Sequence, residues 1–302
     1  MNLRNSWLIK AASPILIACA AIAAFATQTA AAPKGPVPFG IYDPYGEFSD
    51  DPEITIEHLF LPWEDVYLPS LIEADAYALE RGRSVLVTIE PWTWSRSERN
   101  TPERLQRGIA SGEYDRYMSS ICAVLNLFES PVTVRWAHEM EDKSGQFIWA
   151  NWDPDTYIAA YRHMVDLCRA QAPDVNYMWS PLGYENLAEY YPGDDYADII
   201  GLSIFGLQPW EKEILGHERT FQEILAPRYE RANQFGKPIV VAELGYVGDQ
   251  AYVDKWDGDV RQEYPEFPNL AAVVYFNQVE VYPWPDGYGR PNWKFDGHVI
   301  GE

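Results

Sequence analysis

The sequence predicts an α/β protein: a single (β/α)8 TIM barrel that follows an N-terminal signal peptide. Short β-branched runs alternate with longer helical patterns along the chain, and eight such runs are present. About 270 of the 302 residues remain after the N-terminal segment, which is within the usual size of this fold. Two of the runs end on a glutamate, and parallel barrels carry their reactive groups at the carboxyl ends of the strands.

The N-terminal segment has the order of a secretory signal peptide. Two basic residues precede an apolar stretch, residues 11–26, and small residues follow up to Ala32. We therefore expect residues 1–32 to be removed, residues 33–302 to form one catalytic domain, and the protein to be secreted or periplasmic. Cys19 lies in a segment that resembles a lipoprotein processing box, but the apolar run continues past it. Lipid anchoring at Cys19 is therefore the less favoured alternative.

Each expected strand is an apolar, β-branched run bounded by turn residues. In order, the strands cover residues 38–42, 57–61, 84–89, 132–137, 175–179, 199–205, 239–242 and 270–276. The clearest helical patterns between them cover residues 68–81, 113–128, 153–171 and 220–235. The third helix opens with a capping aspartate and a proline, and Gly236 and Pro238 follow the fourth. The helices after the first and seventh strands have the weakest patterns.

Charge and composition restrict the partners. The chain has 23 basic and 45 acidic residues, a net charge of -22, and such a surface repels phosphate backbones. We expect a neutral polysaccharide rather than nucleic acid as the partner, and a monomer. After residue 32, no apolar run has the length of a membrane span. Because the His138-Glu139 pair lacks the second histidine of a zinc-binding helix and no phosphate-binding glycine loop is present, we expect no metal and no cofactor.

Two cysteines follow the N-terminal segment, Cys122 and Cys168. They fall in consecutive expected helices, so in an oxidising compartment they can form a disulfide. Two buried free thiols are an equally acceptable interpretation, because the sequence does not give the distance between them. Both possibilities stay open.

Acidic residues gather at the expected strand ends. Glu139 follows the fourth strand and Glu243 the seventh, so both should project from the carboxyl-terminal face of the barrel. Hydrolysis of a glycosidic bond uses such a pair, one carboxyl to protonate the leaving oxygen and the other to attack or to activate water. Glu90 after the third strand and Asp43 after the first lie on the same rim. We expect this rim to be the active site.

Aromatic residues make up 15% of the chain, and several stand at or after expected strand ends. Flat rings at the mouth of a barrel can stack on sugar rings, although half or more of these residues are expected to serve only in packing. The strand-end aromatics are Trp63, Trp92, Trp94, Trp149, Trp179, Trp210, Tyr275 and Trp284. The expected substrate-binding aromatics are Trp92, Trp149, Trp179, Phe205 and Tyr275.

The ordered motifs RWAHEM (residues 135–140), Trp149, YPGDDY (191–196), GLSIF (201–205) and KPIVVAELG (237–245) resemble those of glycoside hydrolase family 26. The resemblance implies a barrel with the acid/base on strand four and the nucleophile on strand seven. It also implies a retaining, endo-acting enzyme on β-linked polysaccharides, most often β-mannan, with mixed-linkage β-glucan and β-1,3-xylan as less common substrates. Position by position, Glu139 would be the acid/base and Glu243 the nucleophile. Arg135 and His138 would orient the site, and we expect both of them, together with Glu90, to bind the substrate.

Three residues depart from the family pattern. Glu141 stands where asparagine is usual, and Ser203 and Phe205 stand where mannanases tend to have aspartate and tyrosine. The tyrosine would hydrogen-bond the nucleophile and adjust its pKa. The substrate therefore stays open among β-mannan, mixed-linkage or β-1,4-glucan and an exopolysaccharide. The alternative function is a non-catalytic or weakly active glycan-binding barrel that assists polysaccharide export.

The expected mechanism is double displacement, which requires carboxyl groups about 5 to 5.5 Å apart. In it, ionised Glu243 attacks the anomeric carbon, protonated Glu139 releases the leaving sugar, and Glu139 then deprotonates the incoming water. Arg135 lies close enough to the end of strand four for us to predict that it pairs with a rim carboxylate and lowers the pKa of that group.

Overall fold

The computed structural model describes residues 31–93 and 101–301. Within them, eight parallel strands form a closed barrel in which each strand pairs with the next and β8 pairs with β1. This arrangement confirms the predicted fold class. Most of the expected signal peptide, including Cys19, and the aromatic residue Trp94 lie outside the described residues.

All eight expected strands are present, and most of their ends lie close to the predicted positions. The strands are β1 (Phe39–Tyr42), β2 (Ile54–Pro62), β3 (Ser84–Glu90), β4 (Val132–Trp136), β5 (Asn176–Trp179), β6 (Ile199–Leu207), β7 (Ile239–Val247) and β8 (Leu270–Phe276). Strands β2 and β7 are longer than predicted. The sequence places the end of strand seven at residue 242, whereas β7 continues to Val247, so Glu243 lies inside this strand.

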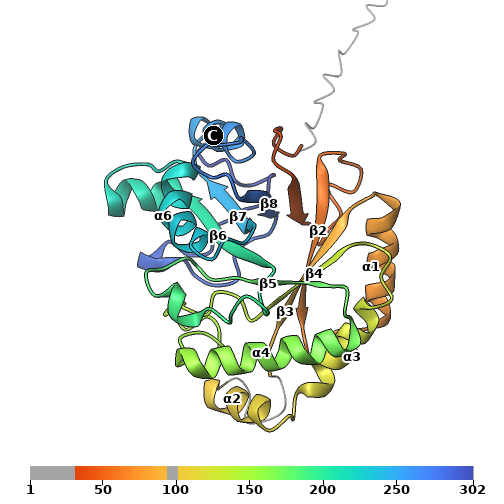
Figure 1. Cartoon of the computed structure of the whole chain (residues 1–302). Coiled ribbons are helices and arrows are strands. Elements are labelled where there is room, and N and C mark those ends of the chain that lie inside the picture. Colours follow the sequence, from red (N-terminus) through yellow and green to blue (C-terminus); the bar gives the residue numbers. More distant parts are fainter. Residues whose placement is uncertain (1–30, 94–100, 302) are drawn as a thin grey trace, which may run out of the picture.

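Helices surround the strands at the periphery of the molecule (Figure 1). The main helices are α1 (Pro69–Glu80), α2 (Pro102–Ala110), α3 (Asp115–Leu125), α4 (Pro154–Gln171), α6 (Phe221–Asn233) and α7 (Gln250–Asp259). Shorter turns are α5 (Gln208–Trp210), η2 (Leu187–Tyr190), η3 (Glu211–Leu215) and η4 (Pro285–Gly287). Between β1 and β2 the described chain forms turns and no helix, as the weak pattern there suggests.

Side-chain caps fix the starts of two of these helices. Asp153 accepts a hydrogen bond from the Thr156 amide at the start of α4, as its sequence predicts. Thr220 and Glu223 form a reciprocal capping box at the start of α6. These caps satisfy amides that have no partner within the helix.

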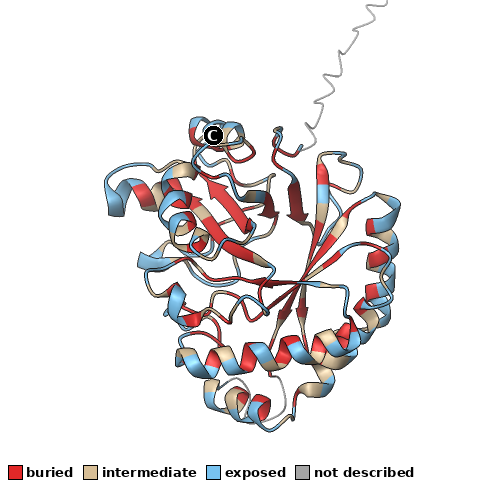
Figure 2. Cartoon of the chain, viewed as in Figure 1, coloured by how far each residue is buried: buried red, intermediate tan, exposed pale blue. Residues whose placement is uncertain are grey.

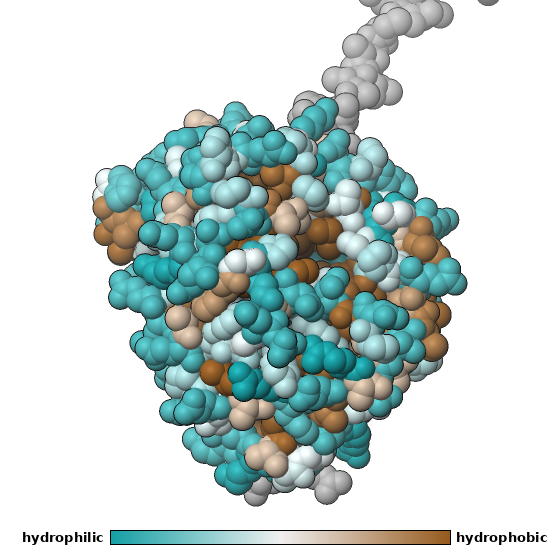
Figure 3. Space-filling view, viewed as in Figure 1, coloured by the Kyte–Doolittle hydropathy of each residue, from teal (hydrophilic) through white to brown (hydrophobic). Residues whose placement is uncertain are grey.

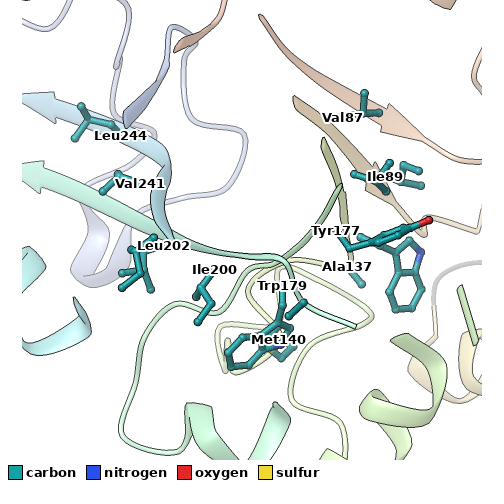
Figure 4. Packing of buried hydrophobic residues seen from close by; sticks show 14 of the residues in the cluster. Val87, Ile89, Ala137, Met140, Tyr177, Trp179, Ile200, Leu202, Val241 and Leu244 are labelled. Carbon is teal, nitrogen blue, oxygen red and sulfur yellow. The ribbon is translucent and has the colours of Figure 1, made fainter. Parts of the chain in front are cut away.

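Two apolar layers hold the barrel together. A small cluster fills its interior, and a much larger one lies between the sheet and the helices. Figure 2 shows the strands almost entirely buried while the helices expose their outer faces, and Figure 4 shows Val87, Leu202 and Val241 of the larger cluster on their strands. The face in Figure 3 is mostly hydrophilic, with apolar residues in small separate groups. The interior cluster contains Leu86, Met178, Val240, Ala242, Ala272 and Val274.

Cys122 on α3 and Cys168 on α4 form a disulfide. The structure therefore decides between the two possibilities that the sequence leaves open. Both residues are fully buried where the two helices pack together. Separately, the described helices include none with the length and apolar character needed to cross a membrane.

We expect the double variant Cys122→Ser/Cys168→Ser to lose about 4 kcal/mol of unfolding free energy, because the disulfide restricts the unfolded chain across a long loop. The measurement is urea unfolding followed by tryptophan fluorescence, with the parent protein under reducing conditions as a control. Reductant should lower the stability of the parent and leave the variant unchanged. Equal urea midpoints for the oxidised parent and the variant would contradict this assignment.

Candidate active site

The backbone after β4 turns sharply and directs Glu139 toward the mouth of the barrel. Ala137 and Glu139 have φ angles of 46° and 55°, which residues other than glycine rarely adopt and which often occur at functional sites. The Glu139 amide donates to the Ser180 carbonyl at 2.7 Å and holds this turn against the end of β5. The Ser203 hydroxyl on β6 donates a hydrogen bond to the Glu139 carboxyl.

An irregularity in β7 directs Glu243 to the same place. The register of β7 shifts against β8 between Val241 and Leu244, and the register between β6 and β7 shifts just before Ser203, which pairs with Glu243. Val241 and Leu244 both belong to the outer apolar layer, so the strand contains one more residue than regular alternation allows. Such a bulge re-aims a side chain. Here it turns Glu243 inward from within the strand, which corrects the prediction that Glu243 follows the strand end.

Arg135 on β4 forms the predicted ion pair with Glu243. Its Nη1 lies 2.6 Å from Glu243 Oε1 and 3.3 Å from Thr88 Oγ1. His138 Nε2 lies 3.7 Å from the same Glu243 oxygen. Arg135 is 0% exposed and His138 2%. They therefore contact the carboxylate and orient it, as the resemblance implies, while substrate binding by these two residues stays a prediction.

The surroundings of the two carboxyls differ. Burial raises the pKa of Glu139 to about 8, and the neighbouring charge of Glu243 adds to this rise. Burial also raises the pKa of Glu243, while the Arg135 guanidinium acts in the opposite direction. Arg135 thus lowers this pKa as predicted, but burial has the larger effect. Because Arg135 donates directly to Glu243, the proton of the pair stays on Glu139 at neutral pH.

Glu90, at the end of β3, is a third carboxyl of this site. Burial raises its pKa to about 7, and the charge of Glu243 adds to the shift, while a hydrogen bond from the Trp92 side chain opposes it. The effect of Glu243 shows that Glu90 faces the same mouth, as its strand-end position predicts. Asp43, by contrast, accepts a hydrogen bond from the Phe48 amide at 2.7 Å and stabilises its own turn.

Glu141 has a structural role, in which it anchors a loop. Its buried carboxylate accepts hydrogen bonds from the amides of Leu182, Gly183 and Tyr184 at 2.8, 3.0 and 3.3 Å. A carboxylate bound by consecutive backbone amides is a strong anchor, and this one fixes the loop after β5. The departure from asparagine at this position therefore concerns loop structure.

The prediction of substrate binding is wrong for three of the expected aromatic residues. Trp149, Trp179 and Tyr275 are each 0% exposed, so their ring faces do not reach a ligand. Trp149 donates to the His138 carbonyl at 2.7 Å, and Tyr275 donates to the Trp293 carbonyl at 2.6 Å. Trp179 packs on the helical side of the barrel against Tyr191 and Phe235. These residues serve in packing, which large aromatic side chains commonly do.

Trp92 and Phe205 remain partly exposed and stay predictions as sugar-binding rings. Phe205 on β6 lies 4.9 Å from Trp293 and 6.4 Å from Trp284 between ring centroids. Gly245 on β7 makes this packing possible, since a Cβ at that position would lie 2.8 Å from the Phe205 ring. A hydrophobic surface therefore borders the site on the side of β6 to β8.

The segment after β8, residues 278–293, was missed as part of the site, and we call it the β8 arm. Glu280 in this arm raises the pKa of Glu243 by its charge, and Trp284 supplies a partly exposed ring. Tyr282 donates to the Ser144 carbonyl at 3.1 Å, which joins the arm to the loop after β4. Only the Trp284 position carried a sequence signal, because the irregular arm has no periodic pattern.

Within residues 31–93 and 101–301, no group of three or more histidine, cysteine or acidic side chains has an arrangement suited to a metal ion. The carboxyl pair, the arginine and the aromatic surface all belong to acid–base and glycan-binding chemistry. The arrangement can protonate a leaving group with Glu139 and offer an ionised carboxylate, Glu243, to an electrophilic carbon.

Comparison with known proteins agrees with this geometry. The family description "Glycosyl hydrolase family 26" matches residues 98–234, which include Glu139. Endoglucanase H of Acetivibrio thermocellus is 24% identical over 77% of this chain and 26% of its own length. Mannan endo-1,4-beta-mannosidase of Bifidobacterium adolescentis is 25% identical over 58% of this chain and 19% of its own length. The chain thus spans about a quarter of these curated relatives or less.

Solved structures share the fold. The catalytic domain of a Bacillus sp. family 26 endo-beta-1,4-mannanase has a TM-score of 0.61 at 16% identity, covering 80% of this chain and 76% of that one. A modular endo-beta-1,4-mannanase from Cellulomonas fimi has a TM-score of 0.61 at 17% identity, covering 82% and 60%. Together with the family match and the ordered motifs around Glu139 and Glu243, these findings support the resemblance of the chain to glycosyl hydrolase family 26.

Proposed function

We propose that this chain is an endo-acting glycoside hydrolase that cleaves a neutral β-linked polysaccharide with retention of configuration. The proposal rests on one observation: the two carboxyls at the mouth of the barrel have different surroundings. Arg135 pairs with Glu243, whereas Glu139 lies half-buried beside that negative charge and accepts a hydrogen bond from Ser203. One protonated and one ionised carboxyl are what double displacement requires.

In the first step, Glu243 attacks the anomeric carbon while Glu139 gives its proton to the departing sugar oxygen. The product is a covalent glycosyl ester on Glu243, and its formation removes the charge that adds to the burial-raised pKa of Glu139. Glu139 has by then given its proton to the leaving sugar and stays ionised as its pKa falls, so its carboxylate can accept a proton from the incoming water. Water attack releases the sugar and restores both groups. The carboxyl separation of about 5 to 5.5 Å typical of retaining enzymes is part of this proposal.

Charge and similarity guide the choice of substrate. Glu243 and Glu280 place negative charge at the mouth of the barrel, so an anionic sugar would be repelled. The relatives are named as an endoglucanase, a beta-1,3-xylanase and a mannan endo-1,4-beta-mannosidase. We place β-glucan first, because the match to Endoglucanase H extends over 77% of this chain.

The proposal includes a secreted or periplasmic location. The disulfide between Cys122 and Cys168 supports it, because such bonds persist mainly in oxidising compartments. Localising the full-length chain by cell fractionation tests it, and recovery in the reducing cytoplasm would contradict it.

Replacing Glu139 or Glu243 by glutamine should lower kcat on the cleaved polymer by about 10²-fold or more, since each removes a group that acts in the transition state. The measurement is release of reducing ends from β-glucan, mannan and xylan. Glu185→Gln, at an exposed position, is the matched control and should behave like the parent. Binding of these polymers without any cleavage by the parent would instead support the glycan-binding alternative.

The kcat/KM of the parent should follow a bell-shaped pH profile. Activity rises with pH as Glu243 ionises and falls near pH 8 as Glu139, whose pKa burial raises to about 8, loses its proton. Glu139→Gln should lack this alkaline fall when assayed on an aryl glycoside whose leaving group needs no protonation. Glu90→Gln should retain it. An alkaline limb that disappears in Glu90→Gln would reassign the acid to Glu90.

Trp284→Ala should raise KM for the polymer about fivefold, corresponding to about 1 kcal/mol of lost ring contact, with little change in kcat. Tyr264→Ala is the control, because Tyr264 precedes β8 and lies at the opposite end of the barrel. Steady-state kinetics on a single soluble polymer measure both. An unchanged KM for Trp284→Ala would remove the β8 arm from the substrate-binding surface.

A further inference from the structure

A chain of buried hydrogen bonds crosses the interior of the barrel beneath the proposed nucleophile. His58 Nε2 on β2 lies 2.7 Å from Thr88 Oγ1 on β3. Thr88 Oγ1 also accepts from Arg135 Nη1 on β4 at 3.3 Å, and the same Nη1 lies 2.6 Å from Glu243 Oε1 on β7. The four side chains are buried. These hydrogen bonds thus link β2, β3 and β4 to one carboxylate oxygen on β7.

We propose that His58 and Thr88 are positioning residues that hold the Arg135 guanidinium on Glu243 and so keep the nucleophile ionised and aligned. This inference rests on the proposed function for the role of Glu243. It adds two residues that contact no substrate and that act through Arg135.

Arg135 needs such support because its long side chain has few other contacts. Its Nε and Nη2 are buried and have no hydrogen-bond partner among the described residues. Arginine loses substantial rotamer freedom when it is fixed. Thr88 and Glu243 are therefore the contacts that determine where the guanidinium lies. Phe205, at the β6 position where mannanases of the resembled family tend to have tyrosine, has no hydroxyl with which to share this task.

His58 has the hydrogen-bonding properties that the end of this series of hydrogen bonds requires. Because Thr88 Oγ1 accepts from the guanidinium, its own proton is available to the imidazole of His58. Burial, together with the Arg135 charge, holds the pKa of His58 well below its usual value, so the ring is neutral and can accept. The Phe60 ring lies 4.3 Å away and packs against it. A protonated imidazole here would repel Arg135 and disturb the alignment.

Arg135 has a strong influence on Glu243 because the other neighbours do not supply a positive charge. Burial holds the pKa of His138 well below its usual value, so that ring is neutral. The remaining groups are carboxyls, which favour protonation of Glu243. The groups that face Glu243 are Arg135 and His138 from β4 and its loop, Glu139 from the same loop, Glu90 from β3 and Glu280 from the β8 arm.

The first test replaces Thr88 by valine, which has nearly the same shape and no hydroxyl. We expect Thr88→Val to lower kcat about tenfold with little change in KM, and to move the acid limb of the kcat/KM profile up by about one pH unit. His58→Phe should act in the same direction. Thr88→Ser keeps the hydroxyl and should restore the parent profile. If serine and valine variants have the same pH profile, the hydroxyl does not position Arg135.

The second test needs no substrate and decides the inference even if no polymer is cleaved. Glu243 has a raised pKa in the folded state, so its contribution to stability is lost as the pH rises through that value. Thr88→Val should raise this pKa further and therefore lose more stability than the parent as the pH rises. Urea unfolding across pH measures this difference, which should disappear in the Glu243→Gln background. An equal difference in both backgrounds would show that Thr88 serves only in packing.

Discussion

The site depends on one buried ion pair, that between Arg135 and Glu243. Removing both charges from water is costly, and the pair is stable only where close geometry and further hydrogen bonds compensate. The barrel supplies this geometry because β4 and β7 each direct a side chain to the centre of the mouth. Two residues separated by 108 positions in the sequence thereby join β4 to β7.

The ion pair also determines what its neighbours can do. Burial raises the pKa of Glu139 and of Glu90, and the charge of Glu243 adds to this rise, so an ionised Glu243 favours the protonated form of both neighbours. In the proposed double displacement, this influence ends when Glu243 becomes an ester, and the pKa of Glu139 falls. Under that proposal the same side chain acts first as acid and then as base. Burial strengthens the coupling, because the electrostatic effect of a charge grows where water is excluded.

Much of this fold follows from the sequence, because buried parallel strands are short apolar runs whose carboxyl ends share one face. That rule places Glu90, Glu139 and Glu243 on the rim. The bulge of β7 does not follow, since it arises from pairing with β6 and β8. The burial of Trp149 and Tyr275 does not follow either, because a strand-end ring can face the mouth or the packing behind it. The β8 arm has no periodicity to detect.

The hydrogen-bond partners of Glu139 and Glu243 explain the departures from the family pattern on β6. Ser203 donates to Glu139, so the β6 position that differs from mannanases contacts the acid/base. Phe205 offers a ring, and the nucleophile receives its hydrogen bond from Arg135 instead of from a β6 hydroxyl. The substitution therefore removes a hydroxyl from β6 while Glu243 keeps a hydrogen-bond partner. Under the proposed function, a change that leaves the support of Glu243 in place favours altered specificity over loss of catalysis.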